Sequence, residues 1–541
     1  MKSPILGSAY VTRSINAANN RMVNLFPEVI AEGGKEPAFL NRAPGLRLIT
    51  TVGLGPVRGL WTFDNNMYVV SGNTLYKLDI EYNITTLGVV ANDGPVSMTD
   101  DGIHLMVACN GPSFVYNANT DAFGQITDPD FPGALTVSYL GGYFVFIEPN
   151  SQRVWTTTLL DPTSIDPLDF ASAEGDPDHL VSSITDHSEV WLFGGNSVEV
   201  WYNSAAGGAG FPLSRIQGAF NEIGCAATFS VAKLDNGLFW LGADDRGRGI
   251  VYRSQGYTGV RISTHAIEWQ IQQYGDISDA IAYTYQQDGH AFYVLTFPTA
   301  EATWVFDVAA QAWHERASFD NGEFTRHRSN CQVSFNQEII VGDYQNGNLY
   351  AFDLDAYSDG PRIQKWLRSW RALPTGTNTL KRTAQHALQL DCEAGVGLNV
   401  YPAAEPLNLT NGSNIIPQPE SGDVVVSYIN LVDCEGSPAD TWFGDFCEDG
   451  GNNTGWYFLG HPAATGYNPE VMLRWSDDGG HTWSNEHWQP MGRIGQYGTR
   501  VIWRRLGMTE KLRDRVYEIS GTDPVKIAIM AAELDVVATR A

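Results

Sequence analysis

A β-hairpin pattern recurs seven times between Met67 and Phe352. In each copy an apolar segment runs into a polar turn and leaves through a short segment that ends in Tyr, Trp or Phe. The aromatic markers are spaced 40, 39, 46, 51, 52 and 46 residues apart, at Tyr76, Tyr116, Trp155, Trp201, Tyr252, Trp304 and Tyr350. A hairpin repeated with this period is typical of β-propeller blades of about 40–50 residues. We therefore predict an all-β chain in which residues 56–355 form a propeller of six or seven blades.

Different patterns flank the repeats. Residues 1–55 hold proline-containing segments, VNLFPE and NRAPGLR, that predict extended chain available to close the propeller. Residues 356–541 resume strand patterns and predict a β-sandwich-like domain, with a long insertion near 401–469 expected to form exposed loops. The segments between the hairpins also alternate, as GVRISTHAIEWQIQ does, which predicts further strands in each blade.

The charge balance restricts the partners of the chain. Its 34 basic and 61 acidic residues give a net charge of −27, which disfavours binding to free nucleic acid or anionic membranes. It remains compatible with duplex DNA that passes along a wall without being held. No stretch approaches 18 uninterrupted apolar residues, and MKSPILGSAY lacks the apolar core of a signal peptide, so synthesis in the cytoplasm is expected. The six cysteines show no regular spacing and are expected to be mainly free thiols, with Cys434 and Cys447 as the one candidate pair.

Two motifs could indicate other functions. SDDGGHTW, from Ser476 to Trp483, fits the Asp-box of sialidases and other propellers, and it also describes a stable turn in which Asp478 accepts backbone hydrogen bonds. We favour the structural interpretation because the motif occurs once and outside the repeats. The acidic loop from Asp440 to Asn453 could offer oxygen ligands to a cation, but it does not fit an EF-hand. We expect neither a metal nor a cofactor.

The candidate functional residues are arginines in two basic segments. Residues 361–382 carry six basic residues and no acidic one, and a second segment runs from Arg500 to Arg515. In the second, Arg500, Ile502 and Arg504 should share one strand face, with Val501, Trp503 and Arg505 on the other. An ordinary solvated strand and a protein interface that meets acidic neighbours are both compatible with this pattern. The candidate interface residues are Arg362, Arg368, Arg371, Arg500, Arg504 and Arg505.

Several stretches taken together resemble one family. They are VNLFPE, APGLR with GPVRGLWTFDNNMYVVSGNTLYKLD, SEVWLFGGNSVEVWYNS with GAFNEIGCAATFSVAKLDNGLFWLG, and MLRWSDDGGHTWSNEHWQPMGRIGQYGTRVIWRRLG. In this order they are similar to the packaged-DNA stabilisation proteins, the tail hub or nozzle proteins of short-tailed bacteriophages. The insertion near 401–469 is longer than the resemblance implies.

The resemblance implies a structural virion protein without enzymatic activity, located in the tail after synthesis in the bacterial host. Six copies would form a ring below the portal and its adaptor ring, continue the DNA channel and close the filled head. The ring would also carry tailspikes or fibres and a plug or needle, and double-stranded DNA would pass through its lumen without sequence recognition. We expect lumen-facing positions to be mainly acidic or small polar.

Two alternatives from other classes remain open at this point. The Asp-box and the 16 Trp residues are compatible with a glycan-acting propeller enzyme related to sialidases. A non-catalytic carbohydrate-binding protein of the virion surface would use exposed aromatics such as Trp442 and Trp456.

Overall fold

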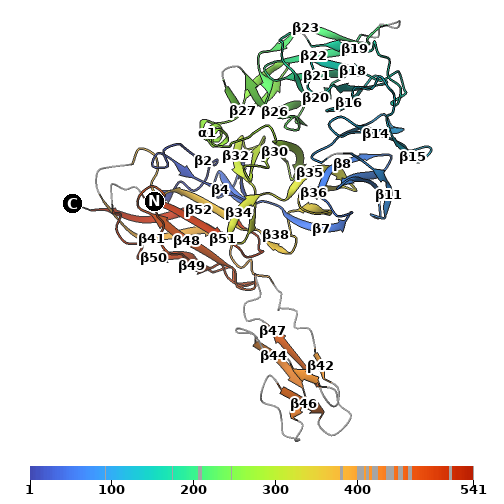
Figure 1. The fold of residues 1–541 in the computed structure, drawn as a ribbon. Helices are drawn as coiled ribbons and strands as arrows, with labels where there is room; N and C mark the ends of the chain where they lie inside the picture. The colour runs from blue at the N-terminus through green and yellow to red at the C-terminus, as the bar shows by residue number, and fades with distance from the viewer. Residues whose placement is uncertain are drawn as a thin grey trace.

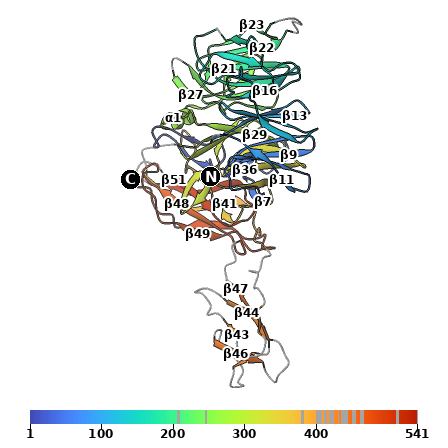
Figure 2. The same ribbon diagram turned by 45° about the vertical axis from the view of Figure 1, so that its right-hand side comes forward.

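The computed structural model contains a propeller-and-sandwich body and, apart from it, a small group of strands (Figures 1 and 2). The structure describes the chain except residues 92, 174, 205–209, 245–246, 378–381, 399–406, 410–413, 417–423, 430, 434–443, 449–454, 461–465, 511–514 and 540–541, and between 407 and 460 it describes the backbone alone.

Seven antiparallel groups of strands form the propeller, one for each blade. Five of them are separate sheets, and blades six and seven belong to larger sheets. The first three blades are β8 (Val57–Phe63) to β11 (Ile84–Val89) with β9 (Asn66–Ser71) and β10 (Thr74–Leu78); β12 (Ser97–Asp100), β13 (His104–Ala108), β14 (Ser113–Asn117) and β15 (Ala122–Gln125); and β16 (Val137–Leu140), β17 (Tyr143–Ile147), β18 (Arg153–Thr156) and β19 (Phe170–Ser172). Blades four and five are β20 (Leu180–Asp186), β21 (Glu189–Gly194), β22 (Val198–Asn203) and β23 (Leu213–Asn221); and β24 (Gly224–Cys225), β25 (Ala232–Leu234), β26 (Gly237–Asp244), β27 (Gly247–Gln255) and β28 (Thr258–Arg261). Blade six is β29 (Ile281–Gln287), β30 (His290–Phe297), β31 (Ala302–Asp307) and β32 (Ala312–Glu315), and blade seven begins with β35 (Ser329–Phe335), β36 (Glu338–Asp343) and β37 (Asn348–Asp353).

The repeat pattern in the sequence corresponds to the blades. All seven aromatic markers lie on equivalent strands, the partners that follow the central apolar strand of each blade: β10, β14, β18, β22, β27, β31 and β37. The prediction of an all-β chain with a propeller followed by a sandwich is therefore confirmed, and the blade number is seven.

One predicted strand is instead a helix. Residues His265–Gln272 of the alternating segment GVRISTHAIEWQIQ form α1, after β28 has ended at Arg261. The Thr264 side chain accepts a hydrogen bond from the Ile267 amide and caps the helix. Ile267 and Ile271 are buried one turn apart, so the apolar residues follow a helical period that the strand reading overlooked.

Neighbouring blades are joined at the propeller axis by hydrogen bonds between inner strands. The Ser97 hydroxyl accepts from the Val137 amide at 3.0 Å, between blades two and three. The hydroxyls of Thr136 and Ser183 lie 2.7 Å apart, between blades three and four. Every other neighbouring pair has such a link, through Val96 to Arg58, Ser182 to Thr228, Ala282 to Phe229, Tyr283 to Ser329 and Asn330 to Val57. The inner strands therefore form a continuous hydrogen-bonded ring.

The ring is closed by a strand from the N-terminal part of the chain. Strand β7 (Gly45–Thr51) pairs antiparallel with β37 and becomes the fourth strand of blade seven. Strand β38 (Ser358–Asp359) then pairs with β7 in parallel and continues to β39 (Arg362–Ile363). Because the last blade takes its outer strand from residues before the first blade, opening the ring requires β7 to detach.

The propeller and the sandwich share one sheet. Strand β4 (Met22–Val23) pairs with β32 of blade six on one side and with β40 (Trp366–Arg371) on the other. The sheet continues through β51 (Val516–Gly521), β48 (Glu470–Ser476) and β49 (His487–Pro490), which makes nine strands in all. Its sandwich part faces a second sheet of β1 (Lys2–Ser3), β5 (Leu25–Val29), β6 (Ala38–Arg42), β52 (Ala528–Ala538), β41 (Thr383–Cys392) and β50 (Val501–Arg504). The N-terminal segment therefore contributes strands to both sandwich sheets as well as to blade seven.

A buried arginine holds this junction. Arg42 Nη1 donates to the carbonyls of Asp523 and Val525 at 2.6 and 2.8 Å, and Nη2 donates to the Tyr357 carbonyl at 2.9 Å. These carbonyls come from two parts of the chain that are both more than 300 residues away from Arg42 in sequence. Burial lowers the pKa of Arg42 to about 10, so the guanidinium still carries its charge at neutral pH.

The insertion contains strands as well as connections. Strands β42 (Leu407–Leu409), β44 (Val424–Ile429) and β47 (Gly455–Gly460) form one sheet, and β43 (Asn414–Ile416), β45 (Leu431–Asp433) and β46 (Gly444–Glu448) form another. The expectation that this region consists of loops is wrong for these six strands. Segments such as VVVSYI and GWYFLG have the β-branched and aromatic composition that favours strands.

Closure by β7 gives a first prediction. Leu46 on β7 is 1% exposed and packs into the core beneath blades six and seven, whereas Leu48 on the same strand is 49% exposed. Leu46→Ala should lower the free energy of unfolding by about 2–5 kcal/mol, and the control Leu48→Ala by less than about 0.5 kcal/mol. Urea unfolding monitored by Trp fluorescence measures both. Equal losses in the two variants would contradict the closing role of β7.

A buried carboxyl beside the closing strand gives a second prediction. Asp359 pairs with Leu46 in the β38–β7 ladder and receives a hydrogen bond from Gln364 at 3.3 Å, and burial raises the pKa of Asp359 to about 7. Between pH 4 and pH 7 the unfolded chain loses this proton while the folded chain keeps it, so this group's contribution to stability falls as pH rises. Asp359→Asn should remove that loss, and the variant should gain stability relative to wild type between pH 4.5 and pH 8. Urea midpoints at both pH values test this, and a constant difference across the range would refute it.

Candidate functional site

The three arginines of the second basic segment come together at a sheet edge. Strand β50 is the last strand of its sheet and pairs with β41 alone. Val501 and Trp503 are buried whereas Arg500 and Arg504 are exposed, so the predicted alternation holds through Arg504. Arg505 departs from it, because its φ of 60° turns the chain and it too is exposed. Arg500, Arg504 and Arg505 are therefore all available to a partner.

The arginines of the first basic segment are placed differently. Arg368, on β40 in the interior of the nine-stranded sheet, is 1% exposed and donates from Nε to the Ile5 carbonyl at 2.7 Å. Burial lowers the pKa of Arg368 to about 10. Arg371 is half-buried on the same strand, with Nη2 3.5 Å from the Ile15 carbonyl. Arg362, on β39, forms an ion pair with Asp320 at 2.7 Å.

The six candidates therefore do not form one site. Arg368 is enclosed by its own chain and cannot contact a neighbouring subunit, so its assignment to an exposed interface is corrected. The sequence pattern failed there because a basic run does not reveal that strand β40 lies between two other strands of a sheet. The group on β50 is the part of the prediction that the structure brings together.

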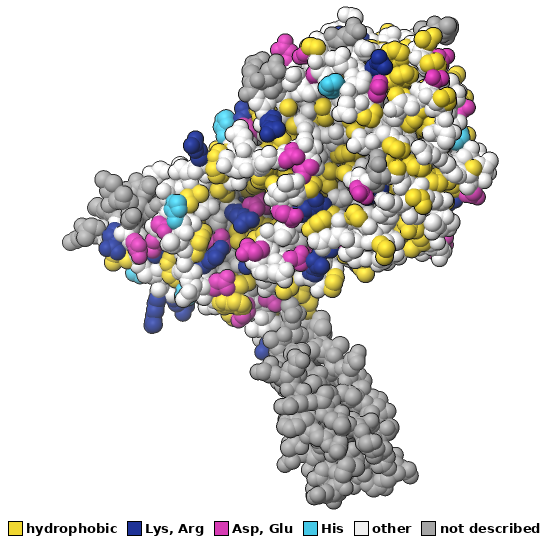
Figure 3. Space-filling model, in the orientation of Figure 1, with side chains coloured by type: hydrophobic (Ala, Val, Ile, Leu, Met, Phe, Trp, Pro, Cys, Tyr) yellow, Lys and Arg dark blue, Asp and Glu magenta, His cyan; other side chains and the backbone are white. Residues whose placement is uncertain are grey.

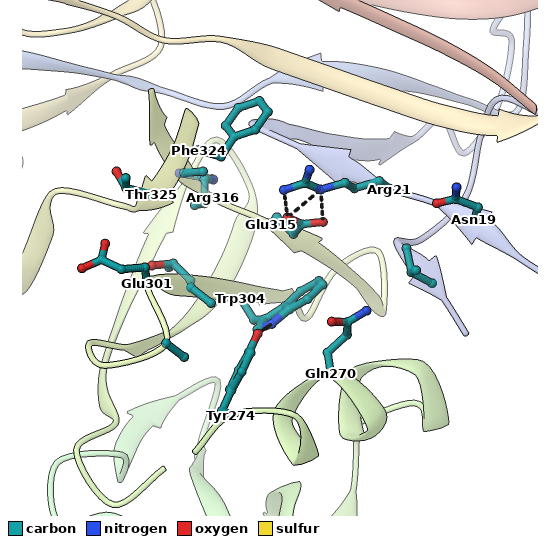
Figure 4. Close-up of a pocket in the computed structure, with 15 residues that line it drawn as sticks. Asn19, Arg21, Gln270, Tyr274, Glu301, Trp304, Glu315, Arg316, Phe324 and Thr325 are labelled. Atoms are coloured by element: carbon teal, nitrogen blue, oxygen red, sulfur yellow. Dashed lines mark hydrogen bonds and ion pairs between the residues drawn. The ribbon is translucent and has the colours of Figure 1, made fainter. Parts of the chain in front are cut away.

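A pocket that the sequence did not indicate lies where propeller, N-terminal segment and sandwich meet (Figure 4). It encloses about 320 Å³. Arg21 donates from Nε and Nη2 to the Glu315 carboxylate at 2.9–3.1 Å, across 294 residues of sequence. Glu315 raises the pKa of Arg21, whose guanidinium also lies over the Phe324 ring at 5.1 Å. This ion pair spans the boundary between β32 and the N-terminal segment, and we interpret it as a structural link.

A second cavity follows the propeller axis. Its volume is about 580 Å³, and it is lined by inner-strand residues of all seven blades, many of them Ser or Thr. Ser97, Thr136, Ser182 and Ser183 use their hydroxyls in hydrogen bonds between blades. The buried hydroxyls of Ser138 and Thr185 have no hydrogen-bond partner among the described residues. A cavity of this volume does not admit duplex DNA, whose major groove alone is about 12 Å wide.

The Asp-box forms the predicted turn. Asp478 accepts hydrogen bonds from the Ser476 hydroxyl at 2.6 Å, from the Thr482 hydroxyl at 2.7 Å, and from the His481 and Thr482 amides at 2.9 Å. These bonds, that from Ser476 above all, hold the pKa of Asp478 well below its usual range. Gly480 has a φ of 109° and donates to the Ser476 hydroxyl at 2.7 Å. The carboxylate is therefore occupied within the turn.

The same turn packs against the N-terminal segment. The Asn19 side-chain amide lies 3.4 Å from the Gly479 carbonyl, and a Cβ atom added at Gly479 or Gly480 would collide with Asn16 or Asn19. The turn thus joins two parts of the sandwich domain that are far apart in sequence, and the close approach explains the need for glycine at both positions.

The other sequence-predicted sites are only partly described. The candidate Cys434–Cys447 pair, most of the acidic loop from Asp440 to Asn453, and the side chains of Trp442 and Trp456 lie outside the described residues. Cys109, Cys225, Cys331 and Cys392 form no disulfide. In the described part of the chain, His, Cys, Asp and Glu form no cluster of three that could hold a metal ion, and no helix there has the length and apolarity to cross a membrane.

The fold and two family matches together define a structural protein of the bacteriophage tail. The propeller family of bacteriophage P22 Gp10 matches residues 1–357, and the β-sandwich family of bacteriophage P22 Gp10 matches residues 457–537. The first match alone covers more than half of the chain. The chain therefore belongs to the family of bacteriophage P22 Gp10, the tail hub or nozzle proteins of short-tailed phages.

Several solved structures are similar at low identity. They include the N-terminal domain of Nup159 (10% identity, 60% of this chain and 97% of that chain covered, TM-score 0.36) and the computationally designed Ika8 protein (11%, 57% and 99%, 0.36). PorZ of Porphyromonas gingivalis also matches (9%, 62% and 44%, 0.35). No curated protein sequence matches the chain significantly.

The ion pair at the junction gives a third prediction. Glu315→Gln keeps the shape of the side chain but removes the charge that faces Arg21. We expect the free energy of unfolding to fall by about 1–2 kcal/mol. The loss is no larger because Arg21 is partly solvated. The matched control is Glu148→Gln on blade three, whose partner Arg153 is more exposed and 3.8 Å away. Urea unfolding compares the two variants. A Glu148 variant as unstable as the Glu315 variant would refute the linking role of the pair.

Proposed function

We propose that the chain forms a hexameric tail hub that extends the DNA channel below the portal and its adaptor ring and closes the filled head. The observation that carries this proposal is the pair of Gp10 family matches, which cover propeller and sandwich in the same order in which the structure contains them. The hub would be located in the virion tail, after synthesis in the host cytoplasm.

The geometry of the propeller supports a channel between copies. The axial cavity of a single propeller is only about 580 Å³, so a ring of subunits would have to provide the lumen. Closed cyclic symmetry is the usual arrangement of identical subunits around such an opening. Residues that face the lumen would be mainly acidic or small polar, because each Lys or Arg contact with phosphate adds affinity and would slow the passing duplex.

Rigidity supports the closing function. The sheet shared by blade six and the sandwich, together with Arg42, makes propeller and sandwich one unit. A hub of such units could bear the load of packaged DNA and carry tailspikes or fibres on its outside and a plug or needle at its lower end. In this proposal the chain binds its neighbours in the tail and forms the wall of the DNA channel, and it performs no catalysis.

The glycan-acting alternative has less support. Its main sequence indication was the Asp-box, and Asp478 in that motif is saturated by hydrogen bonds within its own turn. Hydrolysis of a sialoside by the purified chain would restore the enzyme hypothesis.

DNA retention gives a fourth prediction. Phage particles assembled without this chain should package DNA and then lose it, because the lower end of the connector stays open. Nuclease sensitivity of the packaged genome measures the loss, and supplying the chain during assembly should restore protection. Particles that lack the chain and still hold a nuclease-resistant genome would contradict the closing function.

A further inference from the structure

The sandwich carries a surface that is basic although the chain is strongly acidic. It consists of residues 487–509, which include β49, its connection to β50, β50 itself and the turn after it. We call it the basic edge. It contains Arg493, Arg500, Arg504 and Arg505 and no acidic residue, in a chain with a net charge of −27.

The arginines of the basic edge are not neutralised within the described part of the chain. All four are exposed, and none forms an ion pair with a described carboxylate. Arg500 Nη2 donates to the Gln389 side chain, and Arg493 lies over the Tyr467 ring at 4.7 Å. Interspersed acidic and basic groups cover the visible sandwich end of the body in Figure 3, as on an ordinary solvated surface. Four guanidinium groups within 13 residues that form no ion pair differ from such a mixed surface. They indicate a partner of opposite charge.

Exposed apolar side chains accompany these arginines. Trp488 is 51% exposed and Tyr497 is 77% exposed, and Ile494 and Met508 are also exposed. Trp503 Nε1 donates to the His487 carbonyl at 2.8 Å, which holds β49 beside β50. Exposed Trp, Tyr, Met and Arg without Lys, Asp or Glu is the composition that distinguishes protein interfaces from other surfaces. Charged residues at a sheet edge can also prevent pairing with a strand of another chain. That role would not require the exposed aromatic residues beside the arginines.

The same chain contains a segment of complementary charge. Residues 401–460 hold nine acidic residues and no Lys or Arg. Neither Gp10 family match covers residues 401–456, since the propeller match ends at 357 and the sandwich match begins at 457. Its charge complements that of the basic edge, which makes this segment the candidate partner of the arginines.

We propose that the basic edge of one copy binds the acidic 401–460 segment of a neighbouring copy in the ring, so that the insertion joins adjacent subunits. This inference rests on the proposed hexamer. It goes beyond it by naming both surfaces of one contact between subunits. The arginines supply the charge that selects the acidic partner, and Trp488 and Tyr497 supply apolar area that is lost to solvent on binding.

Zero-length cross-linking tests the contact. The variant Arg500→Lys, Arg504→Lys, Arg505→Lys keeps the charge and adds amines that carbodiimide joins to nearby carboxylates. Tails assembled from equal amounts of unlabelled and ¹⁵N-labelled full-length chain distinguish links between copies from links within one. We expect mixed-label cross-links from these lysines to Asp or Glu within 401–460, with native Lys526, which is exposed on the same domain, as the control that should not form them. Links exclusively within one copy, links to other regions, or no links would overturn the proposal.

Charge reversal gives an independent arm of the test. Arg500→Glu, Arg504→Glu, Arg505→Glu should reduce the yield of ring assembly at low salt by about tenfold, and the compensating change Asp445→Arg, Glu448→Arg, Asp449→Arg should restore it. The matched control, Arg13→Glu, Arg153→Glu, Arg248→Glu, changes the net charge equally at exposed positions elsewhere and should assemble normally. Rings that form normally from the first variant would overturn the named contact and leave the hub standing. Wild-type tails that lack rings would instead refute the proposed function itself.

Discussion

The structure depends on the closure of seven blades into a ring. Each inner strand hydrogen-bonds to the next, through hydroxyls such as Thr136 and Ser183 or through backbone groups, and β7 completes the last blade. A strand within an open array would leave one blade with an unpaired edge and an unpaired inner face. Closure removes both and leaves an axial cavity of only about 580 Å³. In the proposed hub, the passage for DNA is therefore formed between chains.

The N-terminal segment is the second constraint. Within about fifty residues it contributes β1, β5 and β6 to one sandwich sheet, β4 to the sheet shared with blade six, and β7 to blade seven. Arg21 and Arg42 then fix its position through Glu315 and through carbonyls of the sandwich. Because these contacts join segments that are separated by several hundred residues, neither domain is complete without the first part of the chain. This arrangement joins propeller and sandwich into one unit.

The sequence predicted those features that repeat locally. Aromatic residues such as Trp155 and Trp304 recur once per blade because each occupies the same strand, so their spacing revealed the propeller. The Asp478 turn was also predictable, since all its bonds lie within a few residues. At α1 a capped helix was mistaken for a strand, because short alternating segments fit both periods.

Features that depend on long-range packing were not predictable. Arg368 looked like a surface residue of a basic run, but β40 lies inside the nine-stranded sheet. His314 is fully buried, and neither ring nitrogen has a hydrogen-bond partner in the described part of the chain. Burial holds the pKa of His314 well below its usual value. It lies among Phe26 and Phe292, and Phe26 comes from the N-terminal segment. The Arg21–Glu315 pair likewise could not be predicted, because the two residues are 294 positions apart in the sequence.

The most direct test of this account is an electron-microscopy reconstruction of the assembled, DNA-filled tail that resolves the individual sheets. We predict six copies around the tail axis, each with a closed seven-bladed propeller that contains no DNA, and duplex density only in the lumen between copies. Duplex density that runs through the axis of a propeller, or a tail with a single copy of the chain, would contradict it.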